Sequence, residues 1–289
     1  MRPTRWRRST HVVIGVAILV LVAAVVAAAA VLTRNKPAAT ANGPGSKPQP
    51  ALVTANPGVK PLPDNAAYRE IHPLLLPEVW PPDAANAAAT AQYITERGMK
   101  AFQAAISKGQ HEFPDGLFFG GQAPTWSNLT LRKVLQKYGQ RCQKMAWIDL
   151  HTGLGPSGLG ERIFACADDA AAYTRAKAWW GQGVTSIYDG SSTSPMLTGL
   201  MWMSAYQECP QAEYTGIAME YGTQTQDKVM YALRGDHWLH LHPEAPEALR
   251  QQIKRNLMDA FYVDTNEWRT QIVDQAMESM HQAVTGLNS

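Results

Sequence analysis

The most distinct pattern along the chain is an uninterrupted apolar run at residues 12–32, in which 21 consecutive residues carry no charge. As a helix rising 1.5 Å per residue, this run spans about 30 Å, the thickness of the hydrocarbon core of a bilayer. Four arginines lie within residues 1–11, whereas only Arg34 and Lys36 follow closely. The bias predicts a single-pass anchor in the cytoplasmic (inner) membrane, with the N-terminus in the cytoplasm and the rest outside, periplasmic or extracellular.

A cleavable signal peptide is the alternative interpretation of this run, because its alanine-rich end offers small residues for cleavage. The run is longer than the apolar part of a usual signal peptide, which favours the uncleaved anchor. A buried core helix fits poorly, since no polar face interrupts the run. Residues 33–62 are rich in Pro, Ala, Gly, Asn and Lys without lasting periodicity, which predicts a flexible linker to a folded domain.

From residue 63 onward, short apolar runs alternate with longer amphipathic stretches. The short runs predict strands at 145–150, 161–166, 184–188 and 214–220. The longer stretches predict helices at 84–107 with a break at Gly98, at 129–139 with Asn128 as its cap and Gly139 as its end, and at 168–180, 225–241, 246–260 and 264–286. Strands that alternate with helices indicate an α/β domain over residues 63–289, in which helices flank the sheet.

The charge distribution separates the N-terminus from this domain. The net charge is +2, but the first 36 residues hold six basic residues and no acidic one, which leaves 20 basic and 24 acidic residues in 37–289. A mildly acidic domain without a basic run gives no reason to expect a nucleic-acid partner. The three cysteines, Cys142, Cys166 and Cys209, form no CxxC spacing, so a cysteine-based zinc site is not expected. An exported domain can carry one disulfide, and Cys166 with Cys209 is a candidate pair.

Two apolar strands end in side chains with catalytic chemistry. His151 follows the strand 145–150 and precedes a glycine-rich stretch, and Asp149 points to the same side of a regular strand. An imidazole there is a common zinc ligand that a carboxylate can orient, although a lone histidine is more often structural, since zinc needs about three protein ligands. Glu220 ends the strand 214–220, where burial would suit it to general-base chemistry on a metal-bound water; a structural ion pair is the alternative.

Other histidines carry a weaker signal. His237 and His240 are three residues apart in the motif HWLHLH, which ends at His242, so on a helix they share a face that can hold a metal. We favour a solvated helix end, because no third ligand or carboxylate is evident nearby. His111 and Glu112 are adjacent, and adjacent residues rarely bind one metal together.

Four segments resemble, in this order, a bacterial family of uncharacterised proteins related to the zinc carboxypeptidases. They are DGLFFGGQAPTWSN (115–128), WIDLHTGLGP (147–156), YTGIAMEYGT (214–223) and HWLHLHPEAP (237–246), and the resemblance covers about residues 60–285. It implies a partial carboxypeptidase-like mixed sheet, with His151 as a zinc ligand and Glu220 as the carboxylate that activates the zinc-bound water. The family's other two zinc ligands lie upstream in an HGxEG-type segment, and its Asn-Arg pair for the substrate carboxylate follows them. This sequence has neither before KPLPDNAAYREI (60–71).

The resemblance therefore implies metallopeptidase or amidohydrolase chemistry in an N-terminally shortened domain with an incomplete zinc site, weak or inactive alone. A non-catalytic module that binds peptides or cell-wall stems, for example through the loop 116–126, is the alternative. A partner chain that completes the sheet is a third expectation, because a sheet without its first strands has unpaired edges. Peptide, amide and peptidoglycan all stay open as substrates.

Overall fold

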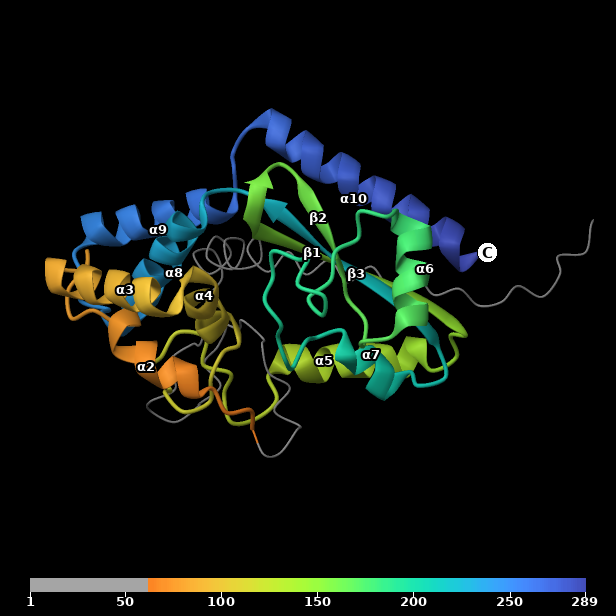
Figure 1. The fold of residues 1–289 in the computed structure, drawn as a ribbon, viewed down its shortest axis with the longest axis horizontal. Coiled ribbons are helices and arrows are strands. Elements are labelled where there is room, and N and C mark those ends of the chain that lie inside the picture. The colour runs from red at the N-terminus through yellow and green to blue at the C-terminus, as the bar shows by residue number, and fades with distance from the viewer. Residues whose placement is uncertain (1–61) are drawn as a thin grey trace, which may run out of the picture.

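The computed structural model describes residues 62–289, so the predicted anchor at 12–32 and nearly all of the linker lie outside the described residues (Figure 1). Within 62–289, no helix combines the length and the hydropathy that crossing a membrane requires.

Three strands form a mixed sheet at the centre of the domain. They are β1 (Lys144–Ser157), β2 (Gly160–Phe164) and β3 (Glu213–Gly222), and their order is β1-β3-β2. β1 runs parallel to β3, and β2 runs antiparallel to it. β1 and β3 bury long continuous stretches, as expected for strands that are covered on both faces. The predicted α/β class with a mixed sheet flanked by helices is confirmed.

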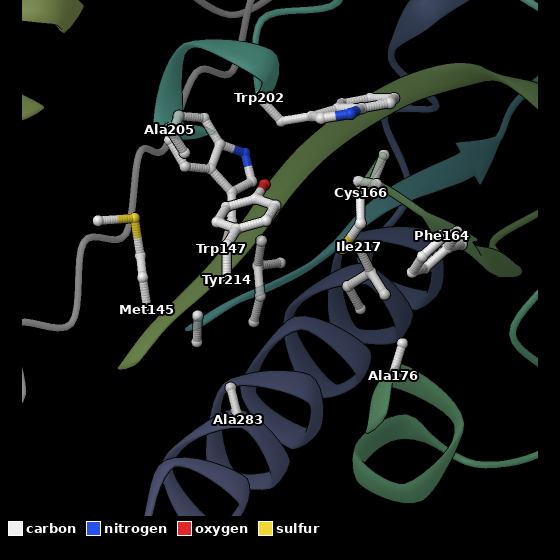
Figure 2. Close-up of a cluster of buried hydrophobic side chains, with 14 of the residues drawn as sticks. Met145, Trp147, Phe164, Cys166, Ala176, Trp202, Ala205, Tyr214, Ile217 and Ala283 are labelled. Carbon is white, nitrogen blue, oxygen red and sulfur yellow. The ribbon is translucent and has the colours of Figure 1, made fainter. Parts of the chain in front are cut away.

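Helices cover both faces of this sheet. α6 (Ala170–Trp180) and α10 (Asn266–Leu287) lie on one face, and the indole Nε1 of Trp180 donates to the carbonyl of Ser279 at 2.9 Å, which joins these two helices. On the other face lie α7 (Met203–Glu208) and α5 (Trp126–Val134), which continues into the π-helix η1 (Leu135–Gly139). Figure 2 shows Ala205 of α7 on one side of the strands, with Ala283 of α10 and Ala176 of α6 on the other.

A second group of helices packs beside the sheet (Figure 1). It consists of α2 (Ala66–Leu75), α3 (Ala84–Arg97), α4 (Met99–Ser107), α8 (Gln226–Leu241) and α9 (Glu247–Phe261). The buried Arg234 of α8 donates to the carbonyls of Leu74 and Leu75 at the end of α2, and to Oδ1 of Asn86 in α3. Carbonyls at a helix C-terminus lack intrahelical partners and carry partial negative charge, so this guanidinium holds three helices together.

Most of the predicted elements are confirmed within a few residues. Gly98, with φ +87°, separates α3 from α4 as its conformational freedom predicts. β1 is longer than the predicted strand 145–150, because it continues through His151 and the glycines to Ser157.

Three expectations need correction. The run 184–188 is not a strand of the sheet, since only Thr185 pairs, in a single bridge with Ile163. The cap of α5 is Thr125 rather than Asn128, and the Thr125 side chain accepts from the backbone N–H of Asn128 at 3.3 Å. The candidate disulfide between Cys166 and Cys209 is not formed; all three cysteines are free thiols, and all three are buried.

The centre of β3 should dominate stability. Ile217 is fully buried there, so Ile217→Ala should lower the free energy of unfolding by about 2–5 kcal/mol through lost burial and a residual cavity. Val273→Ala on α10, where the side chain is 59% exposed, should change it by less than about 0.5 kcal/mol. Urea unfolding followed by tryptophan fluorescence measures both, and equal effects would contradict this account of the core.

Candidate functional site

The parallel pairing of β1 with β3 brings His151 and Glu220 side by side. They are direct partners in the strand register, between the pairs Leu150–Met219 and Thr152–Tyr221. Neighbouring strands lie about 4.8 Å apart, and partners in register point to the same face of the sheet. The structure therefore unites the two residues that the sequence singled out.

Asp149 holds the imidazole of His151. Oδ2 of Asp149 lies 3.0 Å from Nε2 of His151, and the Asp149 side chain is only 4% exposed, against 41% for His151. The two residues point to the same side of β1, as their spacing predicts. Oδ1 of Asp149 has no hydrogen-bond partner among the described residues. The carboxylate thus fixes the orientation of the ring and leaves Nδ1 as its other nitrogen.

The charges around His151 favour its protonated form. Burial lowers the pKa of His151, but the hydrogen bond and charge of Asp149, together with the charge of Glu220, outweigh that effect and raise the pKa to about 9. At neutral pH the site therefore holds an imidazolium between two carboxyl groups.

Glu220 lies in the middle of a row of charged side chains across the sheet. Its partner on β2 is Glu161, opposite the His151 side. Burial raises the pKa of Glu220, and the charge of Glu161 adds to the increase, whereas His151 and the backbone N–H of Leu154 lower it. Oε1 of Glu220 accepts that N–H at 3.0 Å. Glu161 was not among the predicted site residues, because its only signal in the sequence is its place directly after Gly160.

Thr185 and Thr193 hold the carboxylate of Glu161. The hydroxyl of Thr185 donates to its Oε1 at 2.6 Å, and the backbone N–H of Thr193 donates to the same oxygen at 3.1 Å. The run 184–188 thus has a role other than that of a strand, because its Thr185 holds the carboxylate at the end of the charged row.

The glycine-rich segment after His151 wraps over the end of β3. The N–H of Gly158 donates to the carbonyl of Gly222 at 3.0 Å, and the N–H of Gly222 donates to the carbonyl of Leu159 at 3.1 Å. A Cβ at Gly222 would lie 2.1 Å from the carbonyl oxygen of Pro156, so only glycine allows this close approach. The wrap carries the chain from β1 to β2 across β3, and thereby places Leu154 over Glu220.

The described residues do not fit a complete zinc site. A protein zinc site needs about three protein ligands, and no group of three or more His, Cys, Asp or Glu side chains within 62–289 is arranged to hold a metal. His151 supplies one candidate ligand, and Asp149 occupies its Nε2. No catalytic step through a metal follows from these residues.

The histidines of the motif HWLHLH each have a separate partner. Nε2 of His237 lies 2.6 Å from the carbonyl of Asp115, His240 pairs with Asp236 at 3.3 Å, and Nδ1 of His242 lies 2.8 Å from the carbonyl of Trp238. The expected solvated helix end is therefore corrected, since His237 is buried and Asp236 provides a carboxylate beside His240. Nδ1 of His111 lies 2.7 Å from the carbonyl of Gly121, so this ring connects the chain before the loop 116–126 to the loop itself.

A groove of about 600 Å³ lies away from this row of charges. Residues of α3, α4, α8 and α9 line it, and neither His151 nor Glu220 is among them.

Comparisons with known proteins divide the chain into two parts. The family model described as a protein of unknown function (DUF2817) matches residues 57–275, which include His151 and Glu220. The model described as the N-terminal domain of Rv3627c-like carboxypeptidases matches residues 1–61. Carboxypeptidase DacB of Mycolicibacterium smegmatis is 62% identical over 52 residues, which cover 18% of this chain but only 11% of that protein. No solved structure matches the chain significantly.

The role of Asp149 can be tested by titrating His151. We expect a pKa of about 9 for His151, and Asp149→Asn should bring it down to 6.5 or below, because burial then acts without the paired charge. Long-range ¹H–¹⁵N NMR of the imidazoles measures this, with His151→Gln to assign the signal. Asp236→Asn, which removes the partner of His240, is the matched control and should leave His151 unchanged.

The same shift makes stability depend on pH. The pKa of His151 is higher in the folded state, so its contribution is complete below about pH 6.5 and is lost as the pH rises through about 9. A shift of this size corresponds to roughly 3 kcal/mol, and screening of a side chain that is 41% exposed reduces this to about 1 kcal/mol. Urea unfolding can be measured between pH 6 and 10, an interval of about four pH units that contains that pKa. The free energy of unfolding should decline less steeply with pH in His151→Gln than in the unchanged protein.

Proposed function

The chain belongs to the family described as a protein of unknown function (DUF2817). We propose that it is a carboxypeptidase-like protein, held at a membrane by residues 12–32, whose described domain is weakly active or inactive as a hydrolase on its own. The apolar run and its flanking arginines support the anchor. The match of residues 1–61 to the N-terminal domain of carboxypeptidases supports the same assignment from a separate part of the chain.

The register pair of His151 and Glu220 is the observation that carries this proposal. The strands align an imidazole with a buried carboxyl group, in the order of motifs that resembles the zinc carboxypeptidases. In that chemistry His151 would be a metal ligand, and Glu220 would accept a proton from the attacking water. When bound, zinc would lower the pKa of that water and polarise the carbonyl.

Residues 62–289 lack the further zinc ligands that an active hydrolase of this kind needs. Their absence from this part of the chain supports weak or no catalysis by the domain alone. The residues present can still orient a ligand: Asp149 fixes the ring of His151, and Leu154 fixes the carboxyl group of Glu220. A module that binds peptides or cell-wall stems without cleaving them is the second candidate. The fixed orientation of His151 and Glu220, without a group of metal ligands among the described residues, favours it.

Metal content tests the first proposal. The purified full chain, dialysed against zinc and then against buffer, should retain well below one zinc per chain by elemental analysis. His151→Ala should change that value little, and His281→Ala, at an exposed position on α10, is the matched control. One tightly bound zinc per chain that His151→Ala removes and His281→Ala does not would contradict the inactive interpretation.

Peptide binding distinguishes the second candidate. A fluorescent peptide with a free C-terminus and its C-terminal amide can be titrated with the full chain. A binding module should hold the peptide with a Kd that changes less than about threefold on chelation or in Glu220→Gln, since that change corresponds to under 1 kcal/mol. Cleavage of the peptide that chelation and Glu220→Gln both abolish would instead establish a metal hydrolase.

A further inference from the structure

An apolar face of α5 and η1 is uncovered. Trp126 is 78% exposed, Tyr138 51%, and Leu129 and Val134 47% each. Trp126 and Leu129 are three residues apart and Val134 and Tyr138 are four apart, so each pair shares a side of the helix. Four large apolar side chains exposed on one short helical segment mark a contact with something other than water.

The opposite side of the same helix is firmly attached to the domain. Leu131 and Leu135 pack into the core of the sheet, and the guanidinium of Arg132 pairs with Glu208 of α7 at 2.5 Å. Gln136 donates to the other oxygen of Glu208 at 2.7 Å. The helix is therefore fixed in place, and its outer face stays displayed.

Cations accompany the exposed face. Residues 116–148 contain five basic residues and no acidic one. Lys133, Lys137 and Arg141 are exposed and have no ion pair among the described residues, and Nζ of Lys137 lies 5.1 Å from the centre of the Tyr138 ring. The face, defined as Trp126, Leu129, Lys133, Val134, Lys137 and Tyr138, thus combines apolar side chains with uncompensated positive charge.

α10 provides the contrast within the same domain. It also exposes apolar side chains, Val273 at 59% and Met277 at 46%, but the exposed charges beside them are Asp274 and Glu278. α5 and α10 lie on opposite sides of the sheet (Figure 1). Only one of the two apolar faces therefore matches an anionic partner.

We propose that this face of α5 and η1 rests on an anionic lipid bilayer. Trp and Tyr settle at the level of the headgroups, Leu and Val reach the acyl boundary, and Lys side chains extend to anionic headgroups. A protein partner fits less well, because lysine is depleted at the centre of protein interfaces. The inference rests on the proposed function only through the anchor.

The anchor explains why so small a face suffices. Residues 33–61 hold 29 residues, which span at most about 100 Å when fully extended. A tether of this length keeps the domain at a high effective concentration near the bilayer, so a weak second contact is enough to orient it.

The test uses the full chain in lipid nanodiscs made with or without phosphatidylglycerol. Leu129→Cys is labelled with the environment-sensitive dye NBD, and Val273→Cys on α10 carries the same dye as the matched control. The three native cysteines are buried, so the dye reacts at the introduced site. We expect blue-shifted emission that lipid-linked nitroxides quench at position 129, only with phosphatidylglycerol, and none at position 273.

Charge reversal completes the test. Adding Lys133→Glu and Lys137→Glu to the labelled chain should abolish the blue shift, whereas Lys100→Glu with Lys108→Glu, at exposed positions of α4 and its end, should not. An aqueous signal at 129 in both lipid compositions, or a shift that persists after reversal at 133 and 137, overturns the proposal. So does a blue shift in lipid-free detergent that grows with protein concentration, which would assign the face to a second copy of the chain.

Failure of the anchor gives a different result. A chain that does not enter nanodiscs contradicts the anchor, and co-sedimentation of the same variants with phosphatidylglycerol vesicles still decides the lipid contact. Neither result bears on the zinc or peptide measurements, so the two proposals fail separately.

Discussion

The register between β1 and β3 is the constraint on which the candidate site depends. A slip of one residue would turn Glu220 to the opposite face of the sheet from His151. In many sheets the alternation of polar and apolar residues prevents a slip, but these strands bury both faces, so alternation offers little protection. The glycine-rich segment holds the register instead, because the backbone hydrogen bonds of Gly158 and Leu159 with Gly222 fix the end of β1 against the end of β3.

This alignment also determines the charges of the site. A carboxylate as buried as Asp149 is costly to ionise unless it is paired, and His151 supplies the opposite charge at 3.0 Å. Glu220 then lies between a cation on one neighbouring strand and Glu161 on the other. The carboxyl groups of the protein thus stabilise the protonated imidazole of His151, although Oδ1 of Asp149 has no hydrogen-bond partner among the described residues.

Sequence patterns predicted what is local and missed what depends on distant partners. Apolar runs located β1, β3 and the long helices, and the ends of two strands located His151 and Glu220. The same kind of run at 184–188 failed, because only Thr185 of this segment pairs with the free edge of β2, in a single bridge with Ile163. Glu161 was missed for a similar reason: its relation to Glu220 exists only because the chain crosses over β3 between β1 and β2.

The helix at 126–139 shows a further limit of periodicity. Its apolar residues lie on two sides, with Leu131 and Leu135 inward and Trp126, Leu129 and Tyr138 outward, so the pattern alone does not say which side the domain buries. The structure uses the inward side for the core and the ion pair of Arg132 with Glu208. The outward side then carries apolar surface beside unpaired cations, a combination that water does not favour and an anionic bilayer does. The anchor that we propose for residues 12–32 would bring that second solvent within reach.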